Sequence, residues 1–439
     1  MHIGSRAITL CHTCGVAIDP RFFTMPARSH FPQPLSAPAP SKVPGTGASL
    51  GGVQHWAAIA TATLSFARNA RTWVLLLAMG CTPWASATIM AQSNTSNVAT
   101  SGAHQRATKP AKSSHRYKAP KAHAHGDTPE VLALAERIAQ THDLPAPWVR
   151  RQMAHALRLD SLSALVLPPA TPSAKNWQAY RERFVEPRRI AAGLAFWQQH
   201  TQALQRAVQR YGVPAELVVG IIGVETYYGR HMGNFRLIDA LSTLALHFPT
   251  EHPRHSERRA FFQAELGHFL AQAHQAGPSA LNAKGSYAGA AGWPQFMPSS
   301  VAQWGVDFDG NGRIDLVRSP VDAIGSVANY LKSFGWVSGM PTHYPVTPPS
   351  DPTQRETLLL PDILPSFSAE RMTELGATLQ GPGLQHTGPL ALVELHNGGQ
   401  EPSYVAGTEN FYVVTRYNWS SYYALAVIDL AQAIRDARP

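Results

Sequence analysis

The chain has 439 residues, of which 44% are hydrophobic and 15% charged, and it carries a formal net charge of +9. This length leaves room for more than one hydrophobic core, and the composition excludes a chain that is disordered throughout. The three cysteines, Cys11, Cys14 and Cys81, all precede residue 90, which excludes a disulfide or a cysteine nucleophile in the rest of the chain.

The first 91 residues indicate export. Residues 1–67 show no periodic apolar pattern, and we interpret them as a non-native or disordered extension. Residues 68–91 begin with Arg68 and Arg71, continue with an apolar run over 73–79 and end near the small residues 85–87. This basic, apolar and small-residue order is typical of a secretory signal peptide, with an uncleaved membrane anchor as the alternative. We therefore expect the protein in the periplasm, either free or anchored.

A basic linker follows over residues 92–126. Between Thr88 and Gly126 the chain has Lys and Arg residues but no Asp or Glu. Such a Ser/Thr/Ala/Lys-rich segment cannot bury a core, and we predict that it is disordered. Its charge fits nucleic acid, anionic lipid or an anionic wall polymer, and charge alone does not choose among them.

From Thr128 onwards the pattern becomes helical. Apolar residues recur every three or four positions over 129–140, 188–211 and 214–227, which predicts amphipathic helices. Alternation typical of strands is confined to residues near 341–362 and to 410–415. We therefore predict a mainly α fold with small β elements over residues 127–439.

Glu225 is the candidate catalytic residue. The helix that begins near Pro214 and is expected to end near Gly229 places Val218, Ile222 and Glu225 on one face. Burial in an apolar stripe and the partial negative charge of the helix C-terminus both raise the pKa of a carboxyl group. A carboxylic acid that stays protonated near neutral pH suits general acid catalysis. The same spacing also fits a structural Glu that reaches water or pairs with an arginine.

Seven sequence blocks, in order, resemble the membrane-bound lytic murein transglycosylase B family, of the glycoside hydrolase family 103 type. They lie at 222–230 (Ile-Gly-Val-Glu-Thr-Tyr-Tyr-Gly-Arg), 237–244, 258–262, 284–292, 295–300, 323–330 and 416–418. The resemblance implies a lysozyme-like catalytic domain with an accessory helical lobe. It also implies cleavage of the bond between N-acetylmuramic acid and N-acetylglucosamine without water, giving a 1,6-anhydro product. Glu225 matches the family's single general acid and base.

The resemblance extends to residues that bind the substrate. An extra polar segment, 250–257, precedes the two arginines of this set, which suit either the carboxylates of the peptide stem or a structural ion pair. Hydroxyl, amide and aromatic groups suit the hydroxyls, N-acetyl groups and C–H faces of sugars. The matching residues are Ser286, Gln295, Tyr330, Tyr417, Asn418, Tyr423, Arg258 and Arg259.

A cation site is predicted in the loop 307–322. Asp307, Asp309 and Asn311 stand at positions 1, 3 and 5 of an EF-hand pattern, with glycine at position 6 and Arg313 at position 7. Position 12 is Arg318 instead of a bidentate glutamate, and the family resemblance points to Asp322 as its replacement. We expect a structural calcium or sodium ion and no organic cofactor. The alternative is an Asp/Asn/Gly turn held by its own side chains.

The expected partner is the glycan strand of peptidoglycan, with no nucleic acid, with a membrane contact through the N-terminal segment, and with the protein as a monomer. Two other functions keep the same residues. A hydrolytic muramidase needs a second carboxylate to act on water or on the sugar. A non-catalytic peptidoglycan-binding protein needs only the sugar-binding side chains.

Overall fold

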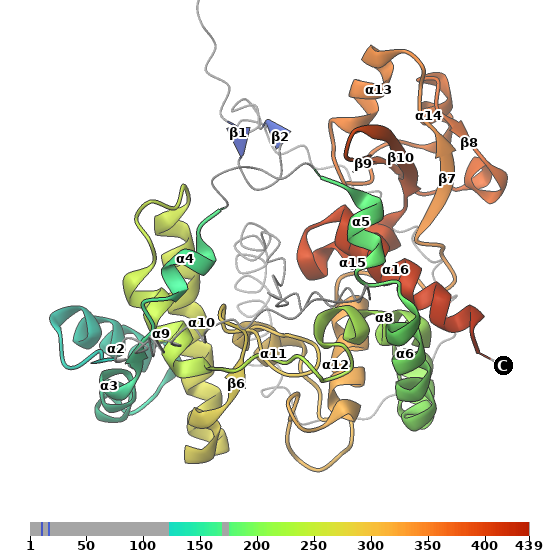
Figure 1. Ribbon diagram of the computed structural model, residues 1–439. Helices are drawn as coiled ribbons and strands as arrows, with labels where there is room; N and C mark the ends of the chain where they lie inside the picture. The colour runs from blue at the N-terminus through green and yellow to red at the C-terminus, as the bar shows by residue number, and fades with distance from the viewer. Residues whose placement is uncertain (1–9, 12–15, 18–122, 169–174, 439) are drawn as a thin grey trace, which may run out of the picture. The chain divides into compact units, whose positions relative to one another are not determined.

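The computed structural model describes residues 10–11, 16–17, 123–168 and 175–438 (Figure 1). The chain forms two compact units, residues 1–80 with 168–174 and residues 81–167 with 175–439. In the first unit, β1 (Leu10–Cys11) pairs with β2 (Val16–Ala17) in an antiparallel arrangement. The signal or anchor predicted at 68–91 and most of the predicted linker lie outside the described residues. All other elements belong to the second unit.

A helical lobe is built around its own hydrophobic cluster. Its first helix begins where the Thr128 hydroxyl accepts the Val131 N–H and Pro129 occupies the first turn. The short strand β3 lies inside the segment predicted as a linker, so the folded region begins a few residues earlier than expected. The elements are β3 (His123–Ala124), α2 (Pro129–His142), α3 (Ala146–His155), β4 (Leu157–Arg158), α4 (Leu162–Val166), β5 (Phe235–Arg236), α9 (Leu237–His247), α10 (His255–Ala276), the 3₁₀ helix Pro278–Asn282 and β6 (Lys284–Gly285).

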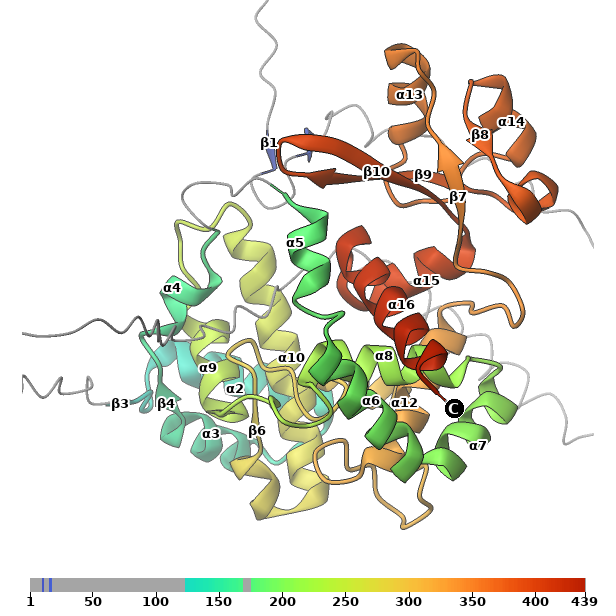
Figure 2. The same ribbon diagram turned by 45° about the vertical axis from the view of Figure 1, so that its right-hand side comes forward.

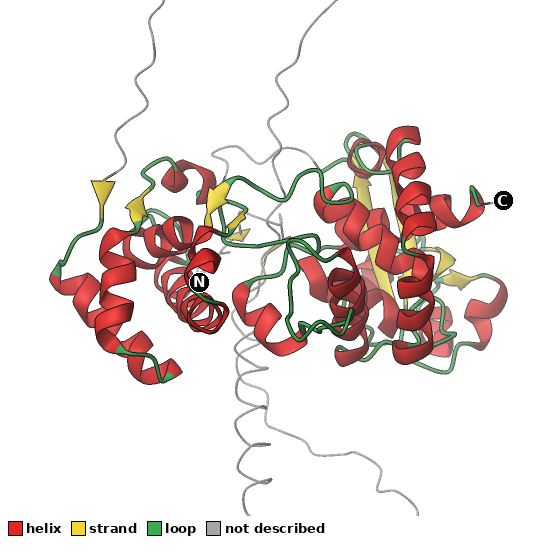
Figure 3. Ribbon diagram, turned by 90° about the horizontal axis from the view of Figure 1, so that it is seen from below, coloured by secondary structure: helices red, strands yellow, loops and turns green. Residues whose placement is uncertain are grey.

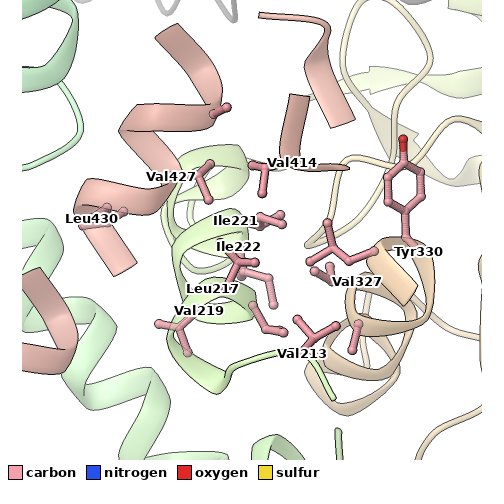
Figure 4. Packing of buried hydrophobic residues seen from close by; sticks show 14 of the residues in the cluster. Val213, Leu217, Val219, Ile221, Ile222, Val327, Tyr330, Val414, Val427 and Leu430 are labelled. Carbon is pink, nitrogen blue, oxygen red and sulfur yellow. The ribbon is translucent and has the colours of Figure 1, made fainter. Parts of the chain in front are cut away.

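The largest hydrophobic cluster surrounds α8, which we call the central core. Figure 4 shows Leu217, Ile221 and Ile222 of α8 packed between side chains of α12 and α16. Because α8 is apolar on nearly all sides, it is buried by helices from both halves of the sequence. The elements are α5 (Trp177–Glu182), α6 (Pro187–Gln199), α7 (Thr201–Tyr211), α8 (Ala215–Thr226), α11 (Pro298–Trp304), α12 (Pro320–Ser333), α15 (Glu409–Asn418) and α16 (Ser421–Asp436).

A four-stranded sheet with the order β8-β7-β10-β9 and antiparallel pairing forms the third part (Figure 2). Leu390, Leu392 and Ala406 face a small cluster with α13 and α14, whereas Val393 and Leu395 join the central core. Most of β9 is therefore buried on both of its faces, whereas β7 alternates between buried and exposed side chains. The elements are β7 (His343–Thr347), α13 (Pro352–Leu359), α14 (Ala369–Glu374), β8 (Thr378–Leu379), the 3₁₀ helix Gly381–Gln385, β9 (Ala391–Asn397) and β10 (Gln400–Gly407).

The mainly helical fold is confirmed (Figure 3), with local corrections. Residues 410–415, predicted as a strand, belong to α15, because the Thr408 hydroxyl caps a helix and Phe411 and Val414 pack into the core. This tertiary burial overrides the β-propensity of the two valines. The single helix predicted over 188–211 is two helices that meet at His200, which lets α6 pack on α8 and α7 on α12.

In the part of the chain that the structure describes, no single helix has the length and apolar character needed to cross a membrane. Helices α7 and α8 are long and apolar enough only when they are taken together, and the chain bends by 116° between them.

Candidate active site

Glu225 lies in the last turn of α8, and its position is fixed by close packing of α8 against α16. A Cβ added at Gly220 would lie 2.7 Å from the backbone oxygen of Val427, so the two helix backbones approach closely. One turn earlier along α16, the Tyr423 hydroxyl donates a 2.6 Å hydrogen bond to Oε1 of Glu225. The glycine and the tyrosine together set where the carboxyl group points.

The surroundings of Glu225 favour its protonated form. Burial raises the pKa of Glu225 to about 7, and the hydrogen bond from Tyr423 acts in the opposite direction. No other carboxylate among the described residues contributes to this shift. Near neutral pH a large fraction of the group is therefore protonated, as a general acid must be, and the carboxylate left after donation can take a proton back.

The backbone turns sharply after Glu225. The predicted helix end at Gly229 is wrong, because α8 ends at Thr226 and the next three residues, Tyr227, Tyr228 and Gly229, all have positive φ. The Thr226 side chain holds this turn by accepting the N–H of Gly229 and donating to the backbone oxygen of Trp293. A Cβ at Gly229 would lie 2.7 Å from the Trp293 ring, so the turn requires glycine there.

Predicted tyrosines form a packed wall beside Glu225. The ring of Tyr417 is stacked on that of Tyr423 at 6.1 Å, and the Tyr330 ring lies 4.9 Å from Tyr417. The hydroxyl of Tyr417 donates to the Pro294 oxygen and that of Tyr330 to the Arg416 oxygen. Burial holds the pKa of Tyr417 and of Tyr423 well above the usual range, so both remain hydrogen-bond donors.

Ser286 and Gln295 are held in the loop 286–297. The Ser286 hydroxyl accepts the Ala290 N–H, and the Gln295 amide donates to the oxygens of Met232 and Gly292. Gln295 has a φ of 49°, an unusual conformation for a residue with a side chain. The last residue predicted for sugar binding, Asn418, ends α15 and directly follows Tyr417 in the sequence.

The two predicted arginines lie in the helical lobe. Arg258 is 2% exposed, and its guanidinium lies over the rings of Phe261 and Phe262 on α10. Its charge lowers the pKa of the buried Glu265, which burial itself raises to about 7. Arg259 donates to the backbone oxygen of Ala245. The structure thus places Arg258 in a packed environment and not at the wall of tyrosines.

The loop 307–322 brings three predicted ligands together. Carboxylate oxygens of Asp307, Asp309 and Asp322 lie within 4.8 Å of one another. Asp322 is fully buried and accepts N–H groups from Phe308, Asp309 and Asp315. Three carboxylates this close repel one another unless a cation lies between them, and an all-oxygen set suits calcium. The chemistry of the donors therefore fits the predicted ion.

The other predicted positions of this loop have different roles. The Asn311 side chain accepts the N–H of Arg313, whose own side chain is exposed. Arg318, at position 12, is also exposed and donates its backbone N–H to Asp315. Ser319, which the sequence did not single out, donates to Asp309 and accepts the N–H of Asp322. The EF-hand numbering alone could not reveal it, because Ser319 lies beyond the twelve positions.

Sequence reasoning also missed three residues close to Glu225. Tyr180 of α5 lies near enough that the charge of Glu225 adds to burial in raising the pKa of Tyr180 to about 12. Thr226 and Trp293 form the hydrogen bond that holds the turn after α8. The backbone N–H of Trp293 in turn donates to the backbone oxygen of Leu316 in the cation loop. Adjacency to Glu225 was a signal for Thr226, but nothing in the sequence pointed to Trp293 or Tyr180.

The sequence comparisons both find transglycosylases. The family described as Transglycosylase SLT domain matches residues 127–432. Membrane-bound lytic murein transglycosylase B of Escherichia coli strain K12 is 39% identical over 324 residues, which cover 71% of this chain and 84% of that protein.

Solved structures extend the comparison. An Escherichia coli lytic transglycosylase in complex with bulgecin A is 40% identical, with a TM-score of 0.63 over 71% of this chain and 96% of that one. The same enzyme has been solved in complex with calcium, at 39% identity, a TM-score of 0.62 and the same coverage. SltB3 of Pseudomonas aeruginosa, in complex with NAG-anhNAM-pentapeptide, is 30% identical, with a TM-score of 0.58 over 70% of this chain and 80% of that one.

Proposed function

The chain belongs to the membrane-bound lytic murein transglycosylase B family, and we propose that Glu225 alone supplies the acid and base chemistry of its reaction. The protein is a peptidoglycan-cleaving lytic transglycosylase with a lysozyme-like, mainly helical fold. The observation that carries the assignment of Glu225 is its half-buried carboxyl group, whose pKa of about 7 is set by loss of solvation and by one tyrosine.

The reaction proceeds in two proton transfers. Protonated Glu225 gives its proton to the oxygen that links N-acetylmuramic acid to N-acetylglucosamine, and the C1–O bond breaks. The carboxylate then takes the proton of the muramoyl C6 hydroxyl while that oxygen bonds to C1. Protons balance, no water is consumed, and the product is a 1,6-anhydro sugar. Only one carboxyl group is needed, in contrast to the paired carboxylates of hydrolytic glycosidases.

The packed wall supports this scheme by fixing geometry. The Tyr423 hydroxyl holds the Glu225 carboxyl in one orientation, which lowers the entropic cost of reaching the transition state. Ser286, Gln295 and Asn418 supply polar groups that bind the sugars. Tyr330 and Tyr417 belong to the packed wall beside Glu225. For Arg258 we favour a structural role, with its charge near Glu265, over a contact with the peptide stem, because its side chain is buried. Arg259 stays a candidate for the stem.

The proposal extends to a calcium ion held by Asp307, Asp309, Asn311 and Asp322, with the backbone oxygen of Arg313. When bound, such an ion neutralises the carboxylates and braces the loop before α12. It has no part in the proton transfers. We also propose that residues 68–91 direct export to the periplasm and that the monomer acts on glycan strands there. Fractionation of cells producing the full chain, with and without residues 68–91, tests the export.

Mass spectrometry of muropeptides released from purified sacculi tests the acid. The native protein is expected to release anhydro products, and Glu225→Gln to release about a hundredth to a ten-thousandth as much, since general acid–base catalysis typically contributes about 10²- to 10⁴-fold. Glu374→Gln, an exposed change on α14, is the matched control and should keep native activity. Reducing ends in place of anhydro ends, or full activity of Glu225→Gln, would contradict the proposal.

A further inference from the structure

Arginine and aromatic side chains alternate along a surface that begins next to the catalytic turn. Arg183 lies over the rings of Tyr180 and Phe184, with 5.3 and 5.9 Å to their centroids. Arg189 lies over Phe184 at 5.3 Å and over Tyr227 at 4.6 Å, and Arg230 lies over Tyr227 at 4.7 Å. We name this set the arginine arc: Arg183, Phe184, Arg189, Tyr227 and Arg230.

Both ends of the arc are connected to the surroundings of Glu225. Tyr227 follows Glu225 by two residues, in the turn of positive φ. At the other end, Arg183 covers the ring of Tyr180, which is near enough to Glu225 for their charges to interact. Arg183 and Arg230 are both exposed. A group attached to a sugar bound at Glu225 could therefore reach them.

The arginines of the arc differ in what they already bind. Arg189 donates a 2.6 Å hydrogen bond to the Gly223 oxygen and so holds the end of α8. Arg183 and Arg230 form no ion pair with any residue that the structure describes. The acidic neighbour Glu186 accepts the backbone N–H groups of Arg188 and Arg189 at the start of α6. Two positive charges are thus left beside the site without a counterion among the described residues.

Stacking on aromatic rings prepares these side chains for an anion. A guanidinium group that lies flat on a ring keeps its N–H edge free, and that edge matches the two oxygens of a carboxylate. The ring also limits the conformations of a long side chain, which reduces the entropy lost on binding. The arc is thus ordered for binding before any ligand arrives.

We propose that Arg183 and Arg230 bind carboxylates of the peptide stems of peptidoglycan, and so favour strands that carry peptides. This rests on the proposed function. The N-acetyl sugars of the glycan are neutral once the lactyl group is joined to a peptide, so the anionic groups of the substrate are on the stems. Of the two arginines considered earlier for this role, Arg258 is buried, and the side chain of Arg259 donates to the backbone oxygen of Ala245.

The experiment compares Arg183→Gln, Arg230→Gln and the double variant on two substrates. One is glycan strands with unmodified peptide stems, and the other is the same strands after the stem carboxylates have been converted to amides with a carbodiimide and ammonia. For each single variant, KM on the unmodified strands should rise about two- to fivefold, as expected for a partly exposed charge pair, with kcat unchanged. On the amidated strands both constants should match the native protein. Arg371→Gln, an exposed arginine on α14, is the control.

Two further readouts keep the outcome decisive. The rise in KM of the native protein with salt should be weaker in the double variant, because fewer charges are screened. Arg230→Lys, which keeps the charge but not the planar fork, should recover part of the loss. Equal changes on both substrates, or no change on either, would overturn the proposal. Loss of anhydro products from both substrates by the native protein would instead overturn the proposed function.

Discussion

At the scale of single residues, the acidity of Glu225 is a balance between two neighbouring influences. Burial in the central core raises its pKa, and the hydrogen bond donated by Tyr423 lowers it because that bond stabilises the carboxylate. The tyrosine thus keeps the group near the middle of its titration at neutral pH. A carboxyl group buried without this donor would have a higher pKa and would be a weaker acid.

Replacing Tyr423 with phenylalanine tests this balance. The pKa of Glu225 should rise, because the interaction that favours its charged form is lost. The descending limb of the profile of kcat/KM against pH should then move to higher pH, and the rate at the optimum should fall about tenfold, the effect of one hydrogen bond of about 1.4 kcal/mol. Tyr404→Phe removes a similar tyrosine–glutamate bond in the sheet, and its profile should stay native. If the descending limb of the Tyr423→Phe profile lies at the same pH as that of the native protein, the hydrogen bond does not affect the pKa of Glu225.

At the scale of elements, the close approach of α8 and α16 decides where the site lies. Gly220 faces the backbone of Val427, and a larger residue cannot be placed there without moving one helix. The same helix pair carries Glu225 and Tyr423, so a small displacement changes the hydrogen bond at the acid. Packing and catalysis depend on one interface.

Gly220→Ala should therefore lower both stability and activity. The added methyl group would meet a backbone oxygen at 2.7 Å, and overpacking of this kind costs about 1–3 kcal/mol. Gly399→Ala, in the hairpin between β9 and β10, has nothing within 4 Å of the new methyl group and serves as the control. Denaturant unfolding measures the free energy of unfolding of the two variants. Equal free energies of unfolding for the two variants would rule out a tight α8–α16 contact.

The cation loop is the second element that reaches the site. The oxygen of Leu316 accepts the Trp293 N–H, and the oxygen of Trp293 accepts the Thr226 hydroxyl next to Glu225. A Cβ at Gly292 would lie 2.1 Å from the Leu316 oxygen, so loop and turn fit together closely. The conformation of the loop is therefore coupled to that of the turn after α8.

Calcium should accordingly raise the melting temperature. An ion present at a hundred times its Kd stabilises the folded state by about 2.7 kcal/mol if it does not bind the unfolded chain. Asp309→Asn removes one charged ligand and should weaken this response, while Asp436→Asn, exposed at the end of α16, should leave it native. Differential scanning calorimetry with calcium or with a chelator makes the comparison. If the melting temperature of the native protein does not change with calcium, the loop has no stabilising calcium site.

At the scale of the whole molecule, two buried carboxyl groups make stability depend on pH. Glu225 in the central core and Glu265 in the helical lobe both have a pKa of about 7, raised by burial. A group with a raised folded-state pKa contributes stability below its unfolded pKa, and the contribution is lost as pH rises through the folded value. Buried His125 and His268 act in the opposite sense, because burial lowers the pKa of each to about 4.

The difference between native protein and Glu225→Gln isolates one of these groups, since the histidines cancel. The variant should match the native stability near pH 4.5 and exceed it by about 1–3 kcal/mol at pH 8, where the native protein must keep a charge in a poorly solvated site. Urea unfolding at both pH values measures the difference. A gain of the same size at both would mean that the ionisation of Glu225 is not its cause.

The sequence by itself determined the features that depend on short spacing. Helical periodicity, the apolar face that carries Glu225 and the Asp307–Asp309–Asn311 spacing each involve residues within a few turns, whose geometry is fixed by the backbone. Tertiary structure decided the partners. Tyr423 is 198 residues from Glu225, and its role as the direct hydrogen-bond donor depends on how α16 packs. Residues 410–415 are helical because their burial outweighs local propensity, and Arg258 is buried because α10 turns it inwards. Contacts of this kind depend on which surfaces meet, and spacing along the chain does not encode that directly.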